Sequence, residues 1–223
     1  MHFDQFAADY KQVLDKNVAL SGEDSEYFAE YKARYLARRL SPDFTGKILD
    51  FGCGVGLLSR SLKKNMPAAK LDGYDISCAS LSCIERELTS EGTFTNDLLQ
   101  LGEDYDLIVI ANVLHHVPVA ERSATIQALA GRLVAGGRLA VFEHNPVNPA
   151  TRWAVKQCAF DTDAVLLPMR ETVAHLESAQ VRVVRQDYIV FMPRVLAWFR
   201  RFEPWLAGVP LGAQYALLGE KHG

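Results

Sequence analysis

Three glycines stand at every second position directly after a short apolar run, in the stretch ILDFGCGVGLL: Gly52, Gly54 and Gly56. A strand, a tight glycine turn and the start of a helix together offer main-chain amides to a ligand, because glycine has no Cβ in the way. An acidic residue, Asp50, stands two positions before the first glycine. This pattern predicts a turn that holds a nucleotide-like ligand against the backbone.

The neighbouring residues restrict which ligand this turn binds. The dinucleotide fingerprint Gly-x-Gly-x-x-Gly would need a glycine where Leu57 stands, and the Gly-Lys-Ser/Thr ending of a P-loop is missing. No lysine or arginine lies between Lys47 and Arg60 to balance a pyrophosphate. Together with Asp50, this favours a cationic ligand without phosphate. S-adenosylmethionine has an amino group, a sulfonium and no phosphate; the alternative is a Rossmann-like oxidoreductase.

The stretch DFGCGVG resembles the first motif of the class I S-adenosylmethionine-dependent methyltransferases, D/E-x-G-x-G-x-G. The resemblance continues along the chain in the order of the family's motifs. It involves the acidic end of the second strand, the third motif, the fourth strand with its loop, and the fifth strand: GYDIS at 73–77, FTNDL at 94–98, YDLIVIANVLHHV at 105–117 and AGGRLAVFEH at 135–144.

The resemblance implies a cofactor site built from strand ends. Asp75 would bind both ribose hydroxyls, since a carboxylate can accept two hydrogen bonds at once. Asp97 would accept from the adenine amino group, with Asn96 as the alternative. Ile76 and Leu98 would enclose the adenine or, alternatively, pack in the core. The predicted cofactor-binding set is Asp50, Gly52, Cys53, Gly54, Gly56, Asp75, Ile76, Asn96, Asp97, Leu98 and Asn112.

Three histidines follow predicted strands and are the candidate catalytic residues: His115, His116 and His144. Methyl transfer is an in-line displacement in which the enzyme positions the acceptor and removes a proton from a hydroxyl. The ordinary pKa of histidine, about 6.5, suits a base at neutral pH. One member of the first pair could instead only pack in its loop. The three side chains could converge, but their spacing does not dictate a metal site, and no metal is predicted.

His144 begins a polar loop, HNPVNPATR, which is predicted to contact the substrate together with Glu143, Asn145 and Arg152. The loop follows the fifth strand, at the end of the sheet where open α/β folds bind ligands. Its two Asn-Pro pairs predict extended backbone, because a residue before proline avoids the helical region.

The elements that position these residues alternate between strand and helix from Gly46 onward. This alternation predicts a doubly wound, Rossmann-like α/β fold with helices on both faces of a parallel sheet. The Ala-Gly-Gly stretch at 135–137 is predicted to stop a helix before the next strand. The family's ending, an antiparallel hairpin, would complete seven strands. The predicted strands are KILDF, KLDGYD, 106–112, 138–144, 181–190 and 213–221, and the predicted helices are 55–65, 78–90, 119–134 and 170–179.

The predicted domain organisation is an N-terminal helical cap at 1–45 and a methyltransferase domain at 46–223. Within the domain, segments 146–170 and 191–212 would enclose the acceptor. In the second segment, apolar residues follow helical spacing with the arginines away from their face, and Pro204 is predicted to end the helix after Glu203. The apolar residues are Val195, Trp198, Phe199, Phe202, Trp205 and Leu206. It would pack on the domain, form a dimer contact, rest on a membrane, or close over a lipidic acceptor.

Composition narrows the class of protein. With 223 residues and a net charge of −3, the chain gives no electrostatic reason to expect nucleic acid as a partner. Asn112-Val-Leu-His also differs from the Asn/Asp-Pro-Pro-Tyr/Phe motif of base methylases. Four cysteines without a CxxC pair favour a reducing cytoplasm. No signal peptide and no spanning run of about 18 apolar residues are expected.

The sequence therefore predicts an S-adenosylmethionine-dependent methyltransferase, a monomer or homodimer, acting at oxygen or nitrogen of a small-molecule acceptor. Sugar- or lipid-linked acceptors are included. The alternatives are a protein methyltransferase and a non-catalytic cofactor-binding protein of the same fold.

Overall fold

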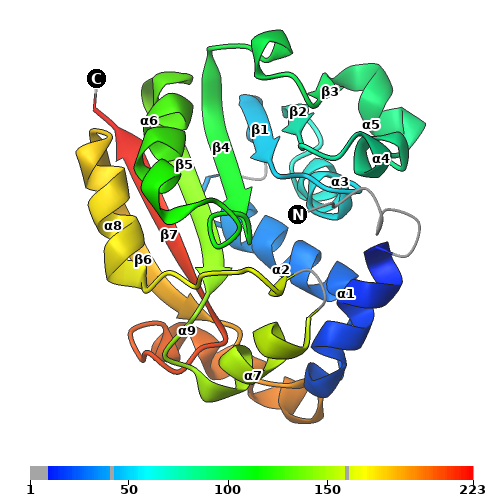
Figure 1. The fold of residues 1–223 in the computed structure, drawn as a ribbon, viewed down its shortest axis with the longest axis vertical. Coiled ribbons are helices and arrows are strands. Elements are labelled where there is room, and N and C mark those ends of the chain that lie inside the picture. The colour runs from blue at the N-terminus through cyan, green and yellow to red at the C-terminus, as the bar shows by residue number, and fades with distance from the viewer. Residues whose placement is uncertain (1–9, 41–42, 159–160, 223) are drawn as a thin grey trace.

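A computed structural model describes residues 10–40, 43–158 and 161–222. Within them, seven strands form one sheet in the order β3-β2-β1-β4-β5-β7-β6, with helices on both faces (Figure 1). The first five strands run parallel, and β7 is antiparallel to both β5 and β6. The predicted doubly wound sheet is confirmed. The strands are β1 Lys47–Phe51, β2 Lys70–Tyr74, β3 Phe94–Thr95, β4 Tyr105–Ala111, β5 Leu133–His144, β6 Val181–Ile189 and β7 Gln214–Lys221.

Short connecting helices join most of these strands. The α-helices are α1 Tyr10–Val18, α2 Ser25–Ala37, α3 Leu57–Asn65, α4 Cys78–Ser82, α5 Arg86–Glu91, α6 Arg122–Gly131, α7 Pro149–Gln157, α8 Met169–Ser178 and α9 Glu203–Leu206. The 3-10 helices are η2 Ala19–Ser21, η3 Leu98–Gln100, η4 Val119–Glu121 and η6 Arg194–Phe202. None of the described helices has the length and apolar composition needed to cross a lipid bilayer.

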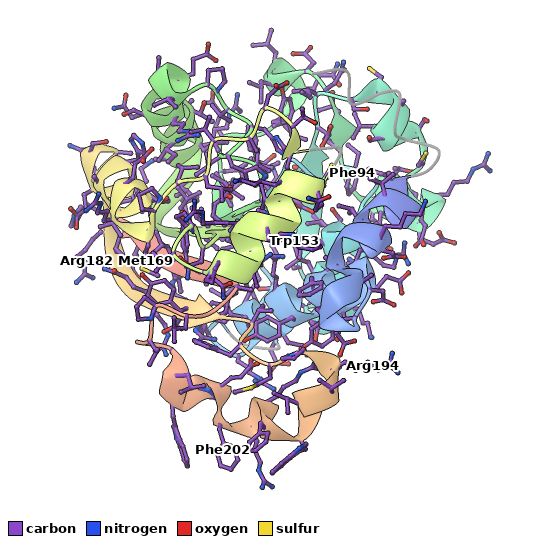
Figure 2. The ribbon with its side chains drawn as sticks, turned by 60° about the horizontal axis from the view of Figure 1, so that its bottom comes forward. Phe94, Trp153, Met169, Arg182, Arg194 and Phe202 are labelled. Carbon is purple, nitrogen blue, oxygen red and sulfur yellow. The ribbon has the colours of Figure 1, made fainter. Side chains whose placement is uncertain are left out.

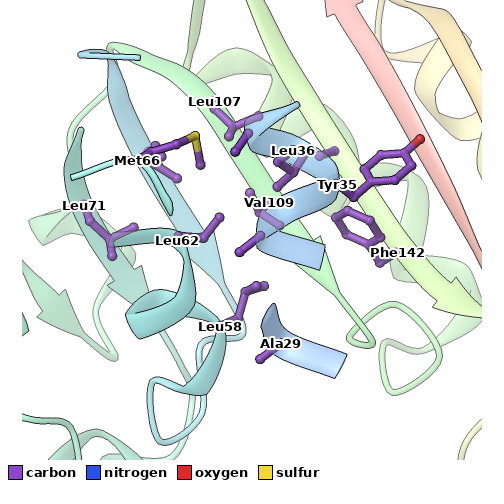
Figure 3. Close-up of a cluster of buried hydrophobic side chains, with 14 of the residues drawn as sticks. Ala29, Tyr35, Leu36, Leu58, Leu62, Met66, Leu71, Leu107, Val109 and Phe142 are labelled. Carbon is purple, nitrogen blue, oxygen red and sulfur yellow. The ribbon is translucent and has the colours of Figure 1, made fainter. Parts of the chain in front are cut away.

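The central strand β4 explains why its sequence is continuously apolar. Leu107 and Val109 pack into one core cluster, with side chains of α2 and α3 (Figure 3). Ile108 and Ile110 pack into the cluster on the opposite face, with side chains of α6 and α8. Successive strand residues point to opposite faces, so a strand covered on both sides needs apolar residues throughout.

The N-terminal helix α2 takes part in this core. Asp24 caps it by accepting a hydrogen bond from the Tyr27 amide at 2.8 Å. Ala29, Ala33 and Leu36, at helical spacing, are buried in the same cluster as α3. Residues 25–37 therefore support the sheet as well as the edge where the cofactor is expected.

Two predicted helices are shorter than the sequence suggested. The predicted helix at 78–90 is divided into α4 and α5, because the backbone at Glu85 is not helical (φ −59°, ψ 140°). At this break the buried side chain of Ile84 packs against Gly56. The second helix ends at Gly131. The Ala-Gly-Gly stretch at 135–137 does not stop it and lies inside β5, where the register against β4 shifts.

Two further predictions, one of a loop and one of a helix, were wrong. The second half of HNPVNPATR is helical, since α7 begins at Pro149. Asn148 has the extended backbone that was predicted, but as the N-cap of this helix, where its side chain accepts a hydrogen bond from the Thr151 amide at 3.1 Å. Residues 195–203 are not one α-helix. Leu196 has non-helical backbone within η6, and Pro204 lies in the first turn of α9.

Candidate cofactor and acceptor site

A cavity of about 720 Å³ lies at the carboxyl ends of β1, β2, β4 and β5. Open α/β sheets bind their ligands at this edge. One side of the wall is the turn at residues 52–54, and the other includes the predicted catalytic histidines. Helices α1 and α2 contribute Leu14, Phe28 and Lys32.

The glycine turn has the backbone that the sequence predicted. Gly52, Gly54 and Gly56 have φ of 81°, 53° and 82°, values that favour glycine. A Cβ on Gly52 would overlap the side chain of Val113. Gly54 lines the cavity, whereas Gly56 does not and instead precedes α3, with Ile84 packed against it.

Asp75, at the tip of β2, faces this turn. Its Oδ2 accepts a hydrogen bond from the Gly54 amide and its Oδ1 one from the Ser77 amide, both at 2.8 Å. Beside it, Ile76 and Leu98 line the cavity with 61% and 39% of their surface exposed. The alternative that these two side chains pack in the core is therefore wrong. They form an apolar part of the cavity wall that also contains the Asp75 carboxylate.

Two predicted cofactor contacts do not belong to the cavity wall. Asp97 caps η3 and accepts from the Leu99 amide at 2.9 Å. The exposed Asn96 donates to Sγ of Cys78 at 3.0 Å. Neither residue is among those that line the cavity, and their predicted contact with adenine stays a prediction.

Asp50 is buried behind the turn, where its Oδ2 accepts from the Ser59 hydroxyl at 2.6 Å. Burial raises the pKa of Asp50 to about 7, although the Ser59 bond and Lys32 favour the charged form. Lys32 itself is buried, which lowers its pKa to about 8. Sequence reasoning missed Lys32, whose only signal was a lysine on the apolar face of a helix.

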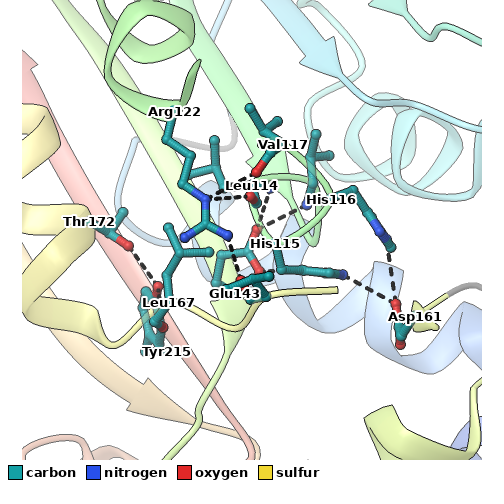
Figure 4. A network of polar contacts seen from close by, with 12 residues as sticks. Leu114, His115, His116, Val117, Arg122, Glu143, Asp161, Leu167, Thr172 and Tyr215 are labelled. Carbon is teal, nitrogen blue, oxygen red and sulfur yellow. Dashed lines mark hydrogen bonds and ion pairs between the residues drawn. The ribbon is translucent and has the colours of Figure 1, made fainter. Parts of the chain in front are cut away.

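The three predicted catalytic histidines all line the cavity. Figure 4 shows two of them, His115 and His116, beside Asp161. His115 Nδ1 lies 2.6 Å from Glu143 Oε2, and its Nε2 lies 3.3 Å from Asp161 Oδ1. His116 Nε2 lies 3.4 Å from the same Asp161 oxygen. The ring of His144 is 5.1 Å from that of His115, centroid to centroid. Four titratable side chains thus meet around His115.

Buried charge sets the protonation of this group. Burial disfavours a charged His115, but Glu143 and Asp161 outweigh it and raise the pKa of His115 to about 9. Burial and the neighbouring His115 lower the pKa of His116 and of His144 to about 4. At neutral pH His116 and His144 are therefore neutral, and His115 is protonated and paired with Glu143 and Asp161.

A buried arginine holds the two segments of this site together. Arg122, on α6, donates to the carbonyls of Leu114 and Val117 and, through Nη2, to the carbonyl of Val165. The Val165 amide in turn donates to the His115 carbonyl at 2.9 Å. The histidine loop and the segment that carries Asp161 are fixed to each other in this way.

Of the polar loop after β5, only His144 lines the cavity. Asn145 is buried and donates to the carbonyls of Pro210 and Gly212, at 3.1 and 2.8 Å, so its role is to anchor the loop. Arg152 is exposed on α7. Sequence reasoning missed Asp161, whose position in the chain carries no recognisable spacing, and treated Glu143 only as a polar residue of this loop.

The wall fits a nucleoside with a cationic arm. The glycine turn, the Asp75 carboxylate and the apolar side chains of Ile76 and Leu98 all line the cavity. The amides of Gly52 and Cys53 donate to the Tyr74 carbonyl and that of Gly54 to Asp75, so the turn meets a ligand with its surface rather than with free amides. Asn112 adds a φ of 58°, which asparagine tolerates better than most residues. Its buried Oδ1 has no hydrogen-bond partner among the described residues.

Residues 49–139 match a protein family described as a methyltransferase domain. The chain carries a class I methyltransferase domain. The cofactor of this domain is S-adenosylmethionine. A solved structure with a similar fold is that of magnesium protoporphyrin IX methyltransferase from Synechocystis PCC 6803 with bound SAH. It superimposes with a TM-score of 0.64 at 20% identity, over 92% of this chain and 86% of that one.

Curated relatives of the methyltransferase domain have several acceptors in their names. Ribosomal RNA small subunit methyltransferase C of Shewanella pealeana is 36% identical over 43% of this chain and 30% of its own length. Ubiquinone biosynthesis O-methyltransferase of Cronobacter sakazakii is 29% identical over 47% and 45%. The matched part of this chain spans less than half of either relative.

Proposed function

We propose that this protein transfers the methyl group of S-adenosylmethionine to a hydroxyl or amine of a small acceptor, of a sugar- or lipid-linked class. One observation carries the proposal: a single cavity is lined both by Asp75 with the glycine turn and by His115, His116 and His144. A protein that only binds the cofactor would not need these three histidines and the Asp161 carboxylate on the wall of the same cavity.

The bound cofactor would supply a methyl group on a sulfonium: the acceptor's lone pair forms the new bond to carbon while the carbon–sulfur bond breaks and leaves its electrons on sulfur. The protein's residues do the rest. Asp75 and the turn hold the nucleoside, and the acceptor lies against the histidines. His116 takes the acceptor's proton, and the Asp161 carboxylate, 3.4 Å away, stabilises the resulting imidazolium. Glu143 keeps His115 in place.

The acceptor class is supported by a surface outside the cavity wall. No residue of 191–212 lines the cavity, so the prediction that this segment encloses the acceptor is wrong, whereas Cys158 and Asp161 of the segment 146–170 do line it. We call residues 191–212 the aromatic segment; Val195, Trp198 and Trp205 are exposed by 84%, 62% and 80%. These side chains do not pack on the domain, and the segment around Phe202 projects from the body of the molecule (Figure 2). An exposed apolar patch of this kind marks an interaction site.

The charges of the aromatic segment favour an anionic lipid surface over a second protein copy. Its one acidic residue, Glu203, is buried and accepts hydrogen bonds from the Phe191 and Met192 amides at 3.2 and 3.0 Å. Arg194 and Arg201 are exposed beside the aromatic side chains. Aromatic and basic side chains together bind the interface of anionic membranes. A lipid-linked acceptor would then reach the cavity from that surface.

The proposed function is tested by calorimetry with S-adenosylmethionine, followed by a screen for S-adenosylhomocysteine release. The acceptors are phenols, sugars, amines and lipid extracts, with protein extract and ribosomal RNA as rival classes. We expect turnover with a small or lipid-linked acceptor. Turnover confined to protein or RNA, or no binding of the cofactor, would refute the proposal.

The role of His116 is tested with His116→Ala. Loss of a general base lowers rates by about 10²–10⁴-fold, so we expect a drop in kcat of that size with cofactor affinity within a factor of two. His175→Ala, which changes a histidine of α8 that does not line the cavity, is the matched control. An equal kcat for both variants would exclude His116 as the base.

A further inference from the structure

The histidine cluster contains a group of ligand atoms of the kind that binds transition metals. One ring nitrogen of His115, one of His144 and a carboxylate oxygen of Asp161 all lie within 4.8 Å of one another. They come from the loop after β4, the end of β5 and the segment after α7. Such a group is not an acidic surface patch, because His115 and Asp161 are buried and His144 is partly buried.

One edge of this group already has the spacing of a metal site. His115 Nε2 and Asp161 Oδ1 are 3.3 Å apart. In a tetrahedral zinc site with bonds of about 2.0–2.1 Å, neighbouring ligand atoms are about 3.3–3.4 Å apart. An ion between these two atoms would replace the proton that they now share. His144 would complete the set through a small rotation of its ring.

The second shell also has the arrangement of a metal site. Glu143 Oε2 accepts from His115 Nδ1 at 2.6 Å, which directs Nε2 towards Asp161. The other carboxylate oxygen of Glu143 is fixed by the Val113 and Leu114 amides, at 3.0 and 2.7 Å. Histidines that bind metals usually donate their second nitrogen to a carboxylate in this way.

Charge balance points in the same direction. Glu143 and Asp161 place two carboxylates in buried positions, with exposed fractions of 0% and 8%. The cationic groups that act on them are His115, which contacts both, and the buried Lys32, which acts on Glu143. A divalent ion bound by His115 and Asp161 would add positive charge between the two carboxylates, and buried charges are costly unless they are compensated.

Three protein ligands leave at least one coordination position open towards the cavity that all three residues line. Gln214, the cross-strand partner of His144, lies on the same wall and is 7% exposed. Its buried Oε1 has no hydrogen-bond partner among the described residues. This oxygen could accept from a water or hydroxyl held at the open position.

We infer that His115, His144 and Asp161 bind a divalent transition-metal ion of the zinc type, with Glu143 orienting His115. The ion would bind the oxygen of a hydroxyl acceptor and lower the pKa of that hydroxyl. The binding of a hydroxyl acceptor by the ion rests on the proposed function; the metal site itself does not.

Metal binding is measured on a Cys78→Ser/Cys83→Ser background, because these two exposed thiols would also bind the probe ions. After treatment with a chelator, the protein is titrated with Co²⁺ by visible absorption and with Zn²⁺ by calorimetry. We expect one equivalent of each ion and a ligand-field band typical of nitrogen and oxygen ligands. Mg²⁺ should not compete, since it prefers oxygen ligands.

Substitutions assign the ligands. We expect His144→Ala and Asp161→Asn each to weaken Zn²⁺ binding at least 100-fold, and Glu143→Gln to weaken it about 10–100-fold as the loss of a supporting carboxylate does. His175→Ala should bind Zn²⁺ like the background protein. Retained affinity for S-adenosylmethionine in each variant would show that the fold is intact.

The inference is overturned if no equivalent of Zn²⁺ binds, if His144→Ala and Asp161→Asn bind it like the control, or if a thiolate charge-transfer band assigns the ion to cysteine. The outcome is separable from that of the proposed function. Metal binding without turnover of any acceptor would leave the site standing and refute the function, whereas turnover in a protein that binds no metal would refute only the site.

Discussion

The main-chain amide of Gly54 donates a hydrogen bond to Oδ2 of Asp75 at 2.8 Å, and this contact joins the turn after β1 to the tip of β2. The carboxylate is held from its other side by the Ser77 amide. Two elements that are adjacent in the sheet but separate in the sequence thereby form one rigid wall of the cofactor cavity.

Replacing Asp75 should therefore weaken cofactor binding. We expect Asp75→Ala to lower the affinity for S-adenosylmethionine at least tenfold, since hydrogen bonds to a charged group contribute about 1.5–3 kcal/mol. Calorimetry measures the change. Asp104→Ala, at an exposed aspartate outside the cavity wall, is the control and should leave the affinity unchanged. If Asp75→Ala binds within a factor of two of the wild type, the ribose contact is wrongly assigned.

A second prediction concerns the turn itself. Gly52→Ala should lower the melting temperature, because alanine is strained at a φ of 81° and its Cβ would overlap Val113. Gly131→Ala is the matched control. It lies in α6 with open space around a new Cβ, so it should raise stability by about 0.5–1 kcal/mol. Equal melting temperatures for the two variants would contradict the assigned strain.

A third prediction follows from a buried carboxylate far from the cavity wall. Oδ2 of Asp187, on β6, lies 2.8 Å from the Tyr35 hydroxyl, 2.8 Å from Arg39 Nη2 and 2.6 Å from Arg185 Nε. Burial would raise the pKa of Asp187, but these partners outweigh it and hold the pKa below the ordinary value. Folding thus favours the charged carboxylate.

The contribution of Asp187 to stability is therefore fully present above the ordinary aspartate pKa and is lost as pH falls through the lower folded value. At pH 7, Asp187→Asn should cost about 2 kcal/mol in the free energy of unfolding. Urea denaturation should show this difference shrinking in acid. A difference that stays constant between neutral and acidic pH would rule out the stabilised charge.

A fourth prediction tests the aromatic segment. Wild-type protein should float with vesicles that contain anionic lipid and should be released by salt, which screens the arginines. The triple alanine variant at Trp198, Phe202 and Trp205 should stay in solution. Trp153→Ala is the control, because Trp153 is an exposed tryptophan of α7 outside this segment. If the triple variant floats like the wild type, the lipid contact is rejected; a concentration-dependent dimer lost in the triple variant would assign the surface to a second copy.

Local backbone rules predicted some elements well and others poorly. The β-α alternation located the central strands because each buried strand needs a continuous apolar run. Helix ends were less predictable. The break near Ile84 and the entry of 133–137 into β5 depend on packing against Gly56 and on pairing with β4, and neither partner is close in sequence.

The sequence alone determined the sheet, the glycine turn and the cofactor, because φ at Gly52 and Gly54, the strand periodicity and the acidic strand ends are properties of short stretches. It also supplied the three histidines as candidates. Only the tertiary structure decided what those histidines do. The contacts of His115 with Glu143 and Asp161 join three distant segments, and the burial that sets their charge arises only when the chain has folded around them.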